Sequence, residues 1–141
     1  MRNRHPHVQA ALTTMALAAL FVLLTEPVRS TSAWKPGGWI APVNLGAEVN
    51  SAFEDLAPHV SSNGLALYFA STRPESQGGE DLWVSKRTNL DEPWGPATNL
   101  GAVINTSANE RSPALSTNRR LLFFATDRAG GSGGFDIWLS W

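Results

Sequence analysis

Short runs of apolar residues, each bounded by turn-forming residues, recur along the chain from Trp39 to its end. Such runs between Gly, Pro, Asn and Asp are typical of β-strands. No part of this region keeps the 3.6-residue apolar period of an amphipathic helix, so the pattern predicts an all-β fold. Both residues of Asn63-Gly64 tolerate positive φ, which favours a tight hairpin turn. The predicted strands are Trp39–Leu45, Pro58–Ser61, Leu65–Ala70, Asp81–Ser85, Trp94–Leu100, Pro113–Ser116, Leu121–Thr126 and Asp136–Ser140.

The same region contains two copies of one sequence repeat, at an offset of 55 residues. Aligned without a gap, 18 of the 48 residue pairs from Trp39/Trp94 to Lys86/Trp141 are identical. Self-similarity at a fixed period indicates a repeated supersecondary unit. The sequence therefore predicts two repeats, at about residues 39–93 and 94–141.

Two of the predicted strands contain continuous apolar runs, Leu82–Val84 and Leu121–Ala125. Such runs indicate sheets that are buried on both faces. Because no helices are predicted to cover these sheets, the covering layers must be other sheets. Radially stacked, four-stranded antiparallel blades meet that requirement, so two β-propeller-type blades are predicted. A β-sandwich is the alternative, but its outward faces should alternate polar and apolar residues.

The order of motifs within each repeat resembles the WD-repeat-like β-propeller repeat of TolB-type periplasmic proteins. Its most specific pieces here are Gly78-Gly79-Glu80-Asp81-Leu82-Trp83 and Gly133-Gly134-Phe135-Asp136-Ile137-Trp138. The resemblance covers roughly residues 39–141. It implies an exported bacterial protein, periplasmic or secreted, that acts mostly in protein interaction or ligand binding.

The chain departs from that family in one turn and in length. The second hairpin dipeptide is Asn118-Arg119, and because positive φ is costly for Arg, a different turn type is predicted there. Closed propellers have about four to eight blades, whereas this sequence supplies one blade, three strands of the next and the strand Trp39–Leu45. Three interpretations stay open: the chain is a fragment of a longer propeller, a subunit that closes a ring by oligomerising, or a solitary pair of blades. The fragment is favoured, because two blades alone would leave apolar sheet faces exposed to solvent.

The first 33 residues have the parts of a secretory signal peptide. Arg2 and Arg4 precede an uncharged run, Ala10–Leu24, which is predicted to be helical, and small residues follow. Cleavage is predicted after Ser30 or Ala33, leaving residues 34–141 without a membrane segment. An uncleaved anchor is the alternative, but about 20 apolar residues are usually needed to span a bilayer.

Charge and composition narrow the possible functions. The chain has 11 basic and 12 acidic residues and a formal net charge of −1, and removal of residues 1–33 makes it more acidic. This balance argues against nucleic-acid binding. The absence of cysteine excludes disulfides, thiolate metal sites and a cysteine nucleophile. His59 is the one histidine after residue 33, so a histidine-rich metal site is excluded, and no cofactor is predicted.

Residues at equivalent positions in both repeats are the candidate site residues, and repetition favours framework roles for them. Asp81 and Asp136 are expected to accept backbone N–H bonds at the start of a strand; a cation- or ligand-binding carboxylate is the alternative. Arg73 and Arg128 are expected to pair with these aspartates. Framework roles are also predicted for the repeated Gly78, Gly79, Gly133 and Gly134. The repeated Trp39, Trp83, Trp94 and Trp138 are expected in an inter-blade core.

The sequence predicts no catalysis. The sequence has no Gly-x-Ser-x-Gly motif whose serine His59 could activate as a nucleophile, and the position of His59 is Ala114 in the second repeat. Adjacent acids such as Glu54-Asp55 would point to opposite faces of a strand, so they do not make the facing pair of a glycosidase. The prediction is an exported module that binds a protein partner or itself. A carbohydrate-binding module and the propeller portion of an exported hydrolase are the alternatives.

Overall fold

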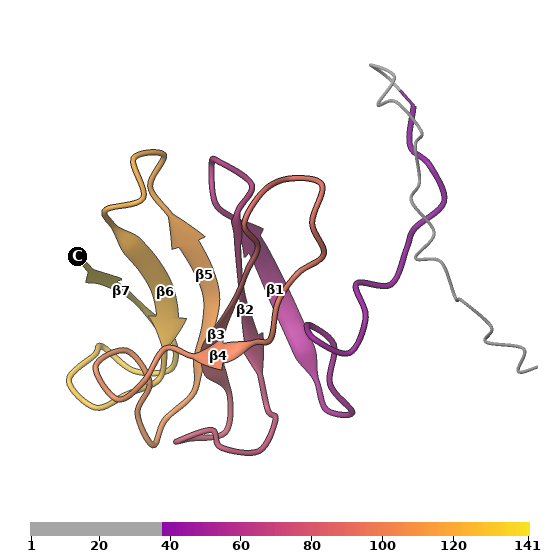
Figure 1. Cartoon of the computed structure of the whole chain (residues 1–141). Coiled ribbons are helices and arrows are strands. Elements are labelled where there is room, and N and C mark those ends of the chain that lie inside the picture. The colour runs from indigo at the N-terminus through magenta and orange to yellow at the C-terminus, as the bar shows by residue number, and fades with distance from the viewer. Residues whose placement is uncertain (1–37) are drawn as a thin grey trace, which may run out of the picture. The chain divides into compact units, whose positions relative to one another are not determined.

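The computed structural model describes residues 38–141, and the predicted signal peptide lies outside this range. The chain divides into Met1–Ile40 and Ala41–Trp141, and all of the strands lie in the second part. Seven strands and their connections make up the structure, with no helix between residues 38 and 141. The prediction of an all-β fold is confirmed (Figure 1).

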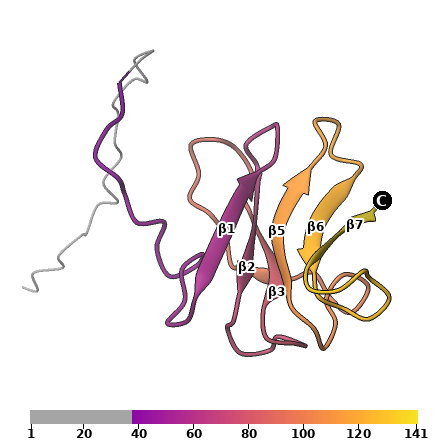
Figure 2. The same cartoon turned by 180° about the vertical axis from the view of Figure 1, so that it is seen from behind.

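The strands form two antiparallel sheets in which each strand pairs with the next along the chain. The first sheet contains β1 (Asp55–Val60), β2 (Ala66–Ser71), β3 (Asp81–Lys86) and β4 (Thr98–Asn99). The second contains β5 (Glu110–Leu115), β6 (Leu122–Thr126) and β7 (Asp136–Ser140). β5 lies against the first sheet, and β7 lies on the far side of β6 and leads to the C-terminus (Figure 2).

The 55-residue repeat of the sequence is reproduced in the strand pairing. Phe69 pairs with Trp83, and Phe124 pairs with Trp138. Every Cα pair within the second sheet is a pair of the first sheet moved by 55 residues. The two sheets are therefore two copies of one strand arrangement, and the second lacks a counterpart of β4.

The first strand of each sheet is interrupted at the same place. Ala57 in β1 and Ser112 in β5 have φ of 49° and 55°, and the register of pairing shifts beside each. Pro58 and Pro113 follow. A bulge bends a strand locally, and proline has no N–H to donate to a neighbouring strand.

Two predicted strands differ from the structure. The strand predicted over Trp94–Leu100 is reduced to β4, since Pro96 removes a donor just before it. The stretch predicted as the strand Trp39–Leu45 contains none, because its backbone groups pair with no strand among residues 38–141.

The prediction that the two hairpin turns differ is wrong. Only the second residue of each dipeptide has positive φ, 72° at Gly64 and 59° at Arg119. The N–H of Gly64 donates to the Ser61 carbonyl at 2.7 Å, and that of Arg119 to the Ser116 carbonyl at 2.8 Å. Asn118 Oδ1 accepts from the Ser116 hydroxyl and from the N–H after Arg119, and these bonds offset the unfavourable φ.

The apolar core forms one cluster on the first sheet and one between the sheets. The first contains Val49, Leu67, Phe69 and Trp83, and the second Ala70, Leu82 and Phe124. β3 is buried at five of its six positions, whereas β7 is buried at none. The predicted burial on both faces is therefore confirmed for β3 and wrong for β6, since one face of the second sheet is uncovered among the described residues.

Candidate functional site

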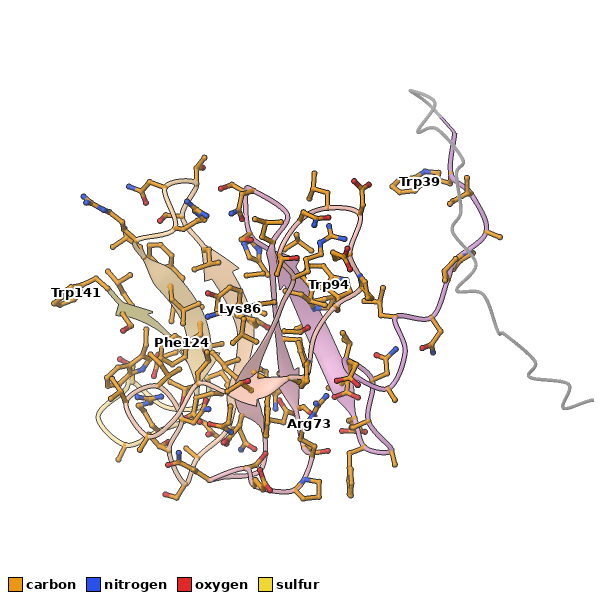
Figure 3. The ribbon with its side chains drawn as sticks, in the orientation of Figure 1. Trp39, Arg73, Lys86, Trp94, Phe124 and Trp141 are labelled. Atoms are coloured by element: carbon orange, nitrogen blue, oxygen red, sulfur yellow. The ribbon has the colours of Figure 1, made fainter. Side chains whose placement is uncertain are left out.

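An arginine ties the segment before β1 to the first sheet. The Arg73 Nη2 donates to the Val49 carbonyl at 2.6 Å and to the carboxylate of Asp55 at the start of β1. Its guanidinium carbon lies 5.0 Å from the ring centroids of Phe69 and of Trp83. Figure 3 shows Arg73 near the end of the sheet where β1 begins. An ion pair that is also stacked on two aromatic rings holds the strand ends together.

The second repeat builds the same cluster with two changed residue types, Glu110 for Asp55 and Ile104 for Val49. The Arg128 Nη2 donates to the Ile104 carbonyl and lies 3.1 Å from Oε1 of Glu110, which is fully buried. Its guanidinium carbon lies 5.1 Å from the rings of Phe124 and of Trp138. Each of these residues is the counterpart, 55 positions on, of one in the Arg73 cluster.

The Asp55 carboxylate is held in its charged form. Burial by itself would raise its pKa, but hydrogen bonds from Arg73, from the N–H and hydroxyl of Ser51 and from Ser71 lower the pKa further than burial raises it. The Ser51 N–H lies 2.6 Å from Asp55 Oδ2. The net effect is a pKa below the usual value for aspartate.

The predicted pairing of Arg73 and Arg128 with Asp81 and Asp136 is wrong. Among the ion pairs of the described residues, both arginines bond the carboxylate that begins the first strand of their own sheet. Asp81 is turned to its own loop, where it accepts the Gln77 N–H at 2.8 Å and the Gly78 N–H at 3.1 Å. Asp136 accepts the N–H of Ser132 at 2.7 Å. Both aspartates thus accept the expected backbone bonds.

The Gly78-Gly79 pair lies against the second repeat. A Cβ on Gly78 would sit 1.8 Å from the Ala108 carbonyl oxygen, and one on Gly79 would sit 2.3 Å from Asn109 Oδ1. At Gly78 only glycine permits this approach of two backbones, and at Gly79 the added Cβ would collide with a side chain. Gly133 and Gly134 have φ of 110° and 66° with nothing within 4 Å of an added Cβ, so that loop is open where its counterpart is covered.

The buried side chain of Asn105 makes polar contacts between the two repeats. Its Oδ1 accepts the Leu82 N–H at 2.8 Å, and its Nδ2 donates to the Leu82 carbonyl at 3.0 Å and to Asn99 Oδ1 at 2.8 Å. Asn99 Nδ2 in turn donates to Asp81 Oδ2 at 2.7 Å. One carboxamide thereby replaces a strand partner for β3 and fixes the second repeat against the first.

Three apolar side chains project from one side of β7 and the residue after it, since alternate residues of a strand share a face. We call Ile137, Leu139 and Trp141 the β7 face; they are exposed to 75%, 43% and 91%. The counterparts of Ile137 and Leu139 in β3 are Leu82 and Val84, and both are buried. Trp141 extends away from the end of β7 (Figure 3).

The one histidine of the described part has a structural contact. His59 Nε2 accepts the Leu115 N–H at 3.1 Å, which joins β1 to β5. In the second repeat this position is Ala114, so the contact belongs to the junction of the two sheets alone.

A groove of about 440 Å³ lies between the two hairpin turns, with Tyr68, Lys86, Arg87 and Arg119 in its walls. A smaller one of about 250 Å³ includes Trp141. Within residues 38–141 no three His, Asp or Glu side chains converge as metal ligands. The same residues include no helix long and apolar enough to cross a membrane.

No protein-family model, no curated protein and no solved structure matches the chain.

Sequence reasoning missed the carboxylates and the asparagine that organise these contacts. Asp55 and Glu110 differ in type, so identity matching at the 55-residue offset passes over them. Asn50 and Asn105 do match, but the bridge to Leu82 depends on tertiary structure. Trp138 packs against the core cluster between the sheets, as expected, whereas Trp94 packs on the cluster of the first sheet. Trp39 is fully exposed, which corrects its assignment to a core.

Proposed function

We propose that the chain is an exported module of two β-propeller-type blades that binds a protein partner in the cell envelope, without catalysis of its own. The four-stranded first sheet and the repeated register support the assignment to blades. The charged start and apolar run of the N-terminal sequence support export to the periplasm or beyond.

One observation carries the proposal. Ile137 is 75% exposed, whereas Leu82 at the equivalent position of the first repeat is 0% exposed. The repeat therefore presents to solvent a strand whose counterpart is covered by protein. A contiguous apolar strip beside an unpaired strand edge is the kind of surface that another polypeptide covers.

The test is site-specific photo-crosslinking of the full chain exported from a bacterial host. A benzophenone amino acid replaces Leu139 on the β7 face, and the matched control carries it at Glu92 on an exposed loop. We expect a discrete protein adduct from position 139 and none from position 92, with the adduct identified by mass spectrometry. Equal labelling at both positions, or no protein adduct, would overturn the proposal.

Carbohydrate binding is a second candidate, favoured by Trp141. This ring is 91% exposed and lines the smaller groove together with Arg120 and Ser140. A flat apolar ring beside hydrogen-bonding groups suits a sugar face. A glycan array distinguishes the two: glycan binding that Trp141→Ala abolishes supports this candidate, and a blank array rejects it.

A further inference from the structure

We infer that the partner of the β7 face is a second copy of this chain, which adds its residues 41–50 to β7 as a fourth strand and bridging loop. The inference rests on the proposed function and names its partner. The contact between the two repeats of one chain serves as the template, because residues 96–105 make the same contact with β3 that residues 41–50 would make with β7.

The template fixes the register of the added strand. In the first sheet Val84 pairs with Thr98, and the Leu100 N–H donates to the Leu82 carbonyl at 3.0 Å. Moved by the 55-residue repeat, the first pair becomes Leu139 with Val43 of the second copy. The backbone bond becomes one from Leu45 of the second copy to the carbonyl of Ile137.

The side chains that would bridge the two copies are present at the positions equivalent to those of the internal contact. The Asn105 side chain bonds both backbone groups of Leu82, whereas the side chain of its counterpart Asn50 bonds only Asn44 among the described residues. Asp81 accepts from Asn99, and the counterpart of that donor for Asp136 is Asn44 of the second copy. A second copy thus brings the two carboxamides that β7 lacks.

The loop that would dock is already shaped for the contact. Asn44 Oδ1 accepts the Gly46 N–H at 2.8 Å and Asn50 Nδ2 at 3.0 Å. In the internal interface Asn99 Oδ1 accepts the Gly101 N–H at 2.7 Å and Asn105 Nδ2 at 2.8 Å. Because the free loop has the conformation of the docked one, little ordering is required on binding.

Apolar complementarity follows the same positions. Leu45 is exposed, whereas its counterpart Leu100 packs against the cluster that contains Leu82. In the assembly Leu45 of one copy would cover Ile137 of another. Donor and acceptor are different surfaces of the chain, so the contact is head-to-tail and extends to rings or to open filaments.

The test uses disulfide trapping, which is clean because the chain has no cysteine of its own. Val43→Cys and Leu139→Cys are prepared as separate full-length variants; both positions are exposed, so folding is retained and is checked by far-UV dichroism. The two variants are mixed and oxidised. We expect a disulfide-linked heterodimer in the mixture, and at least a fivefold lower dimer yield from either variant alone.

Two controls make the result specific. Val84→Cys with Thr98→Cys in one chain should form an intrachain bond, because these residues are paired in the first sheet. Ile137→Cys replaces Leu139→Cys as the register control, on the same side of β7 but two residues away, and should trap less. No preference for the mixture, or equal trapping at both registers, overturns the inference. A benzophenone adduct of position 139 with a different protein would do so while leaving the proposed function standing.

Discussion

Arg73 pairs with Asp55 at the start of β1, although Asp81 is the acid that shares its sequence motif. The ion pair therefore joins the two ends of the β1–β2 hairpin, and the loop that leads into β3 relies on backbone N–H bonds to Asp81. The side chains of Arg73 and Asp55 are 11% and 10% exposed.

Arg73→Ala leaves the Asp55 charge largely buried and unpaired, so it should lower the free energy of unfolding by about 3 kcal/mol. Urea denaturation monitored by tryptophan fluorescence measures this. Arg111→Ala is the matched control, because the Arg111 side chain in its pair with Glu80 is 40% exposed; it should cost about 0–1 kcal/mol. Equal losses in the two variants would contradict the role given to Arg73.

The same pair predicts acid sensitivity. The pKa of Asp55 is lower in the folded state than its usual value of 3.8, so the unfolded chain binds the proton more readily. The stabilisation is complete above the unfolded pKa and is lost as the pH falls through the folded pKa. Asp55→Asn should therefore flatten the dependence of unfolding free energy on pH below about pH 4. An unchanged slope between pH 5 and pH 2 would rule this out.

Arg119 adopts φ 59° in a turn whose counterpart uses glycine. Arg119→Gly removes the steric cost of a side chain in that conformation and should raise the free energy of unfolding by about 1 kcal/mol. The reverse change, Gly64→Ala, should destabilise, since its Cβ would also lie 2.7 Å from Leu90 Cδ2. Thermal melts of both variants test the pair, and destabilisation by Arg119→Gly would show that the Arg side chain contributes more than its strain.

Asn105 and Asn50 occupy equivalent positions with different surroundings. Asn105→Ala leaves the buried N–H and C=O of Leu82 without that partner and should cost about 2 kcal/mol. Asn50→Ala should change the stability of the single chain by less than about 0.5 kcal/mol, yet weaken trapping between Val43→Cys and Leu139→Cys. If Asn50→Ala destabilises the chain as much as Asn105→Ala, its carboxamide has another role.

Most strands were predictable because glycine, proline and asparagine mark their ends and because apolar runs are local features of sequence. The conformation of Arg119 was not predictable, since the hydrogen bonds that Asn118 Oδ1 accepts override a local preference. Bare apolar faces were expected for two blades alone, but the sequence did not identify β7 as the strand that carries one, because Leu82–Val84 and Ile137–Leu139 are both apolar. Whether such a segment is covered depends on its neighbours in space, which composition does not encode.

The bulge and the proline in β1 and β5 restrict the sheet edges to which a further strand can be added. β1, β5 and the two-residue β4 are poor templates, because each is bent, lacks a donor or is too short. β7 has no positive φ and no proline over its five residues. Of the four sheet edges, one can accept another strand, so a growing assembly would be polar and would not polymerise indiscriminately from every side.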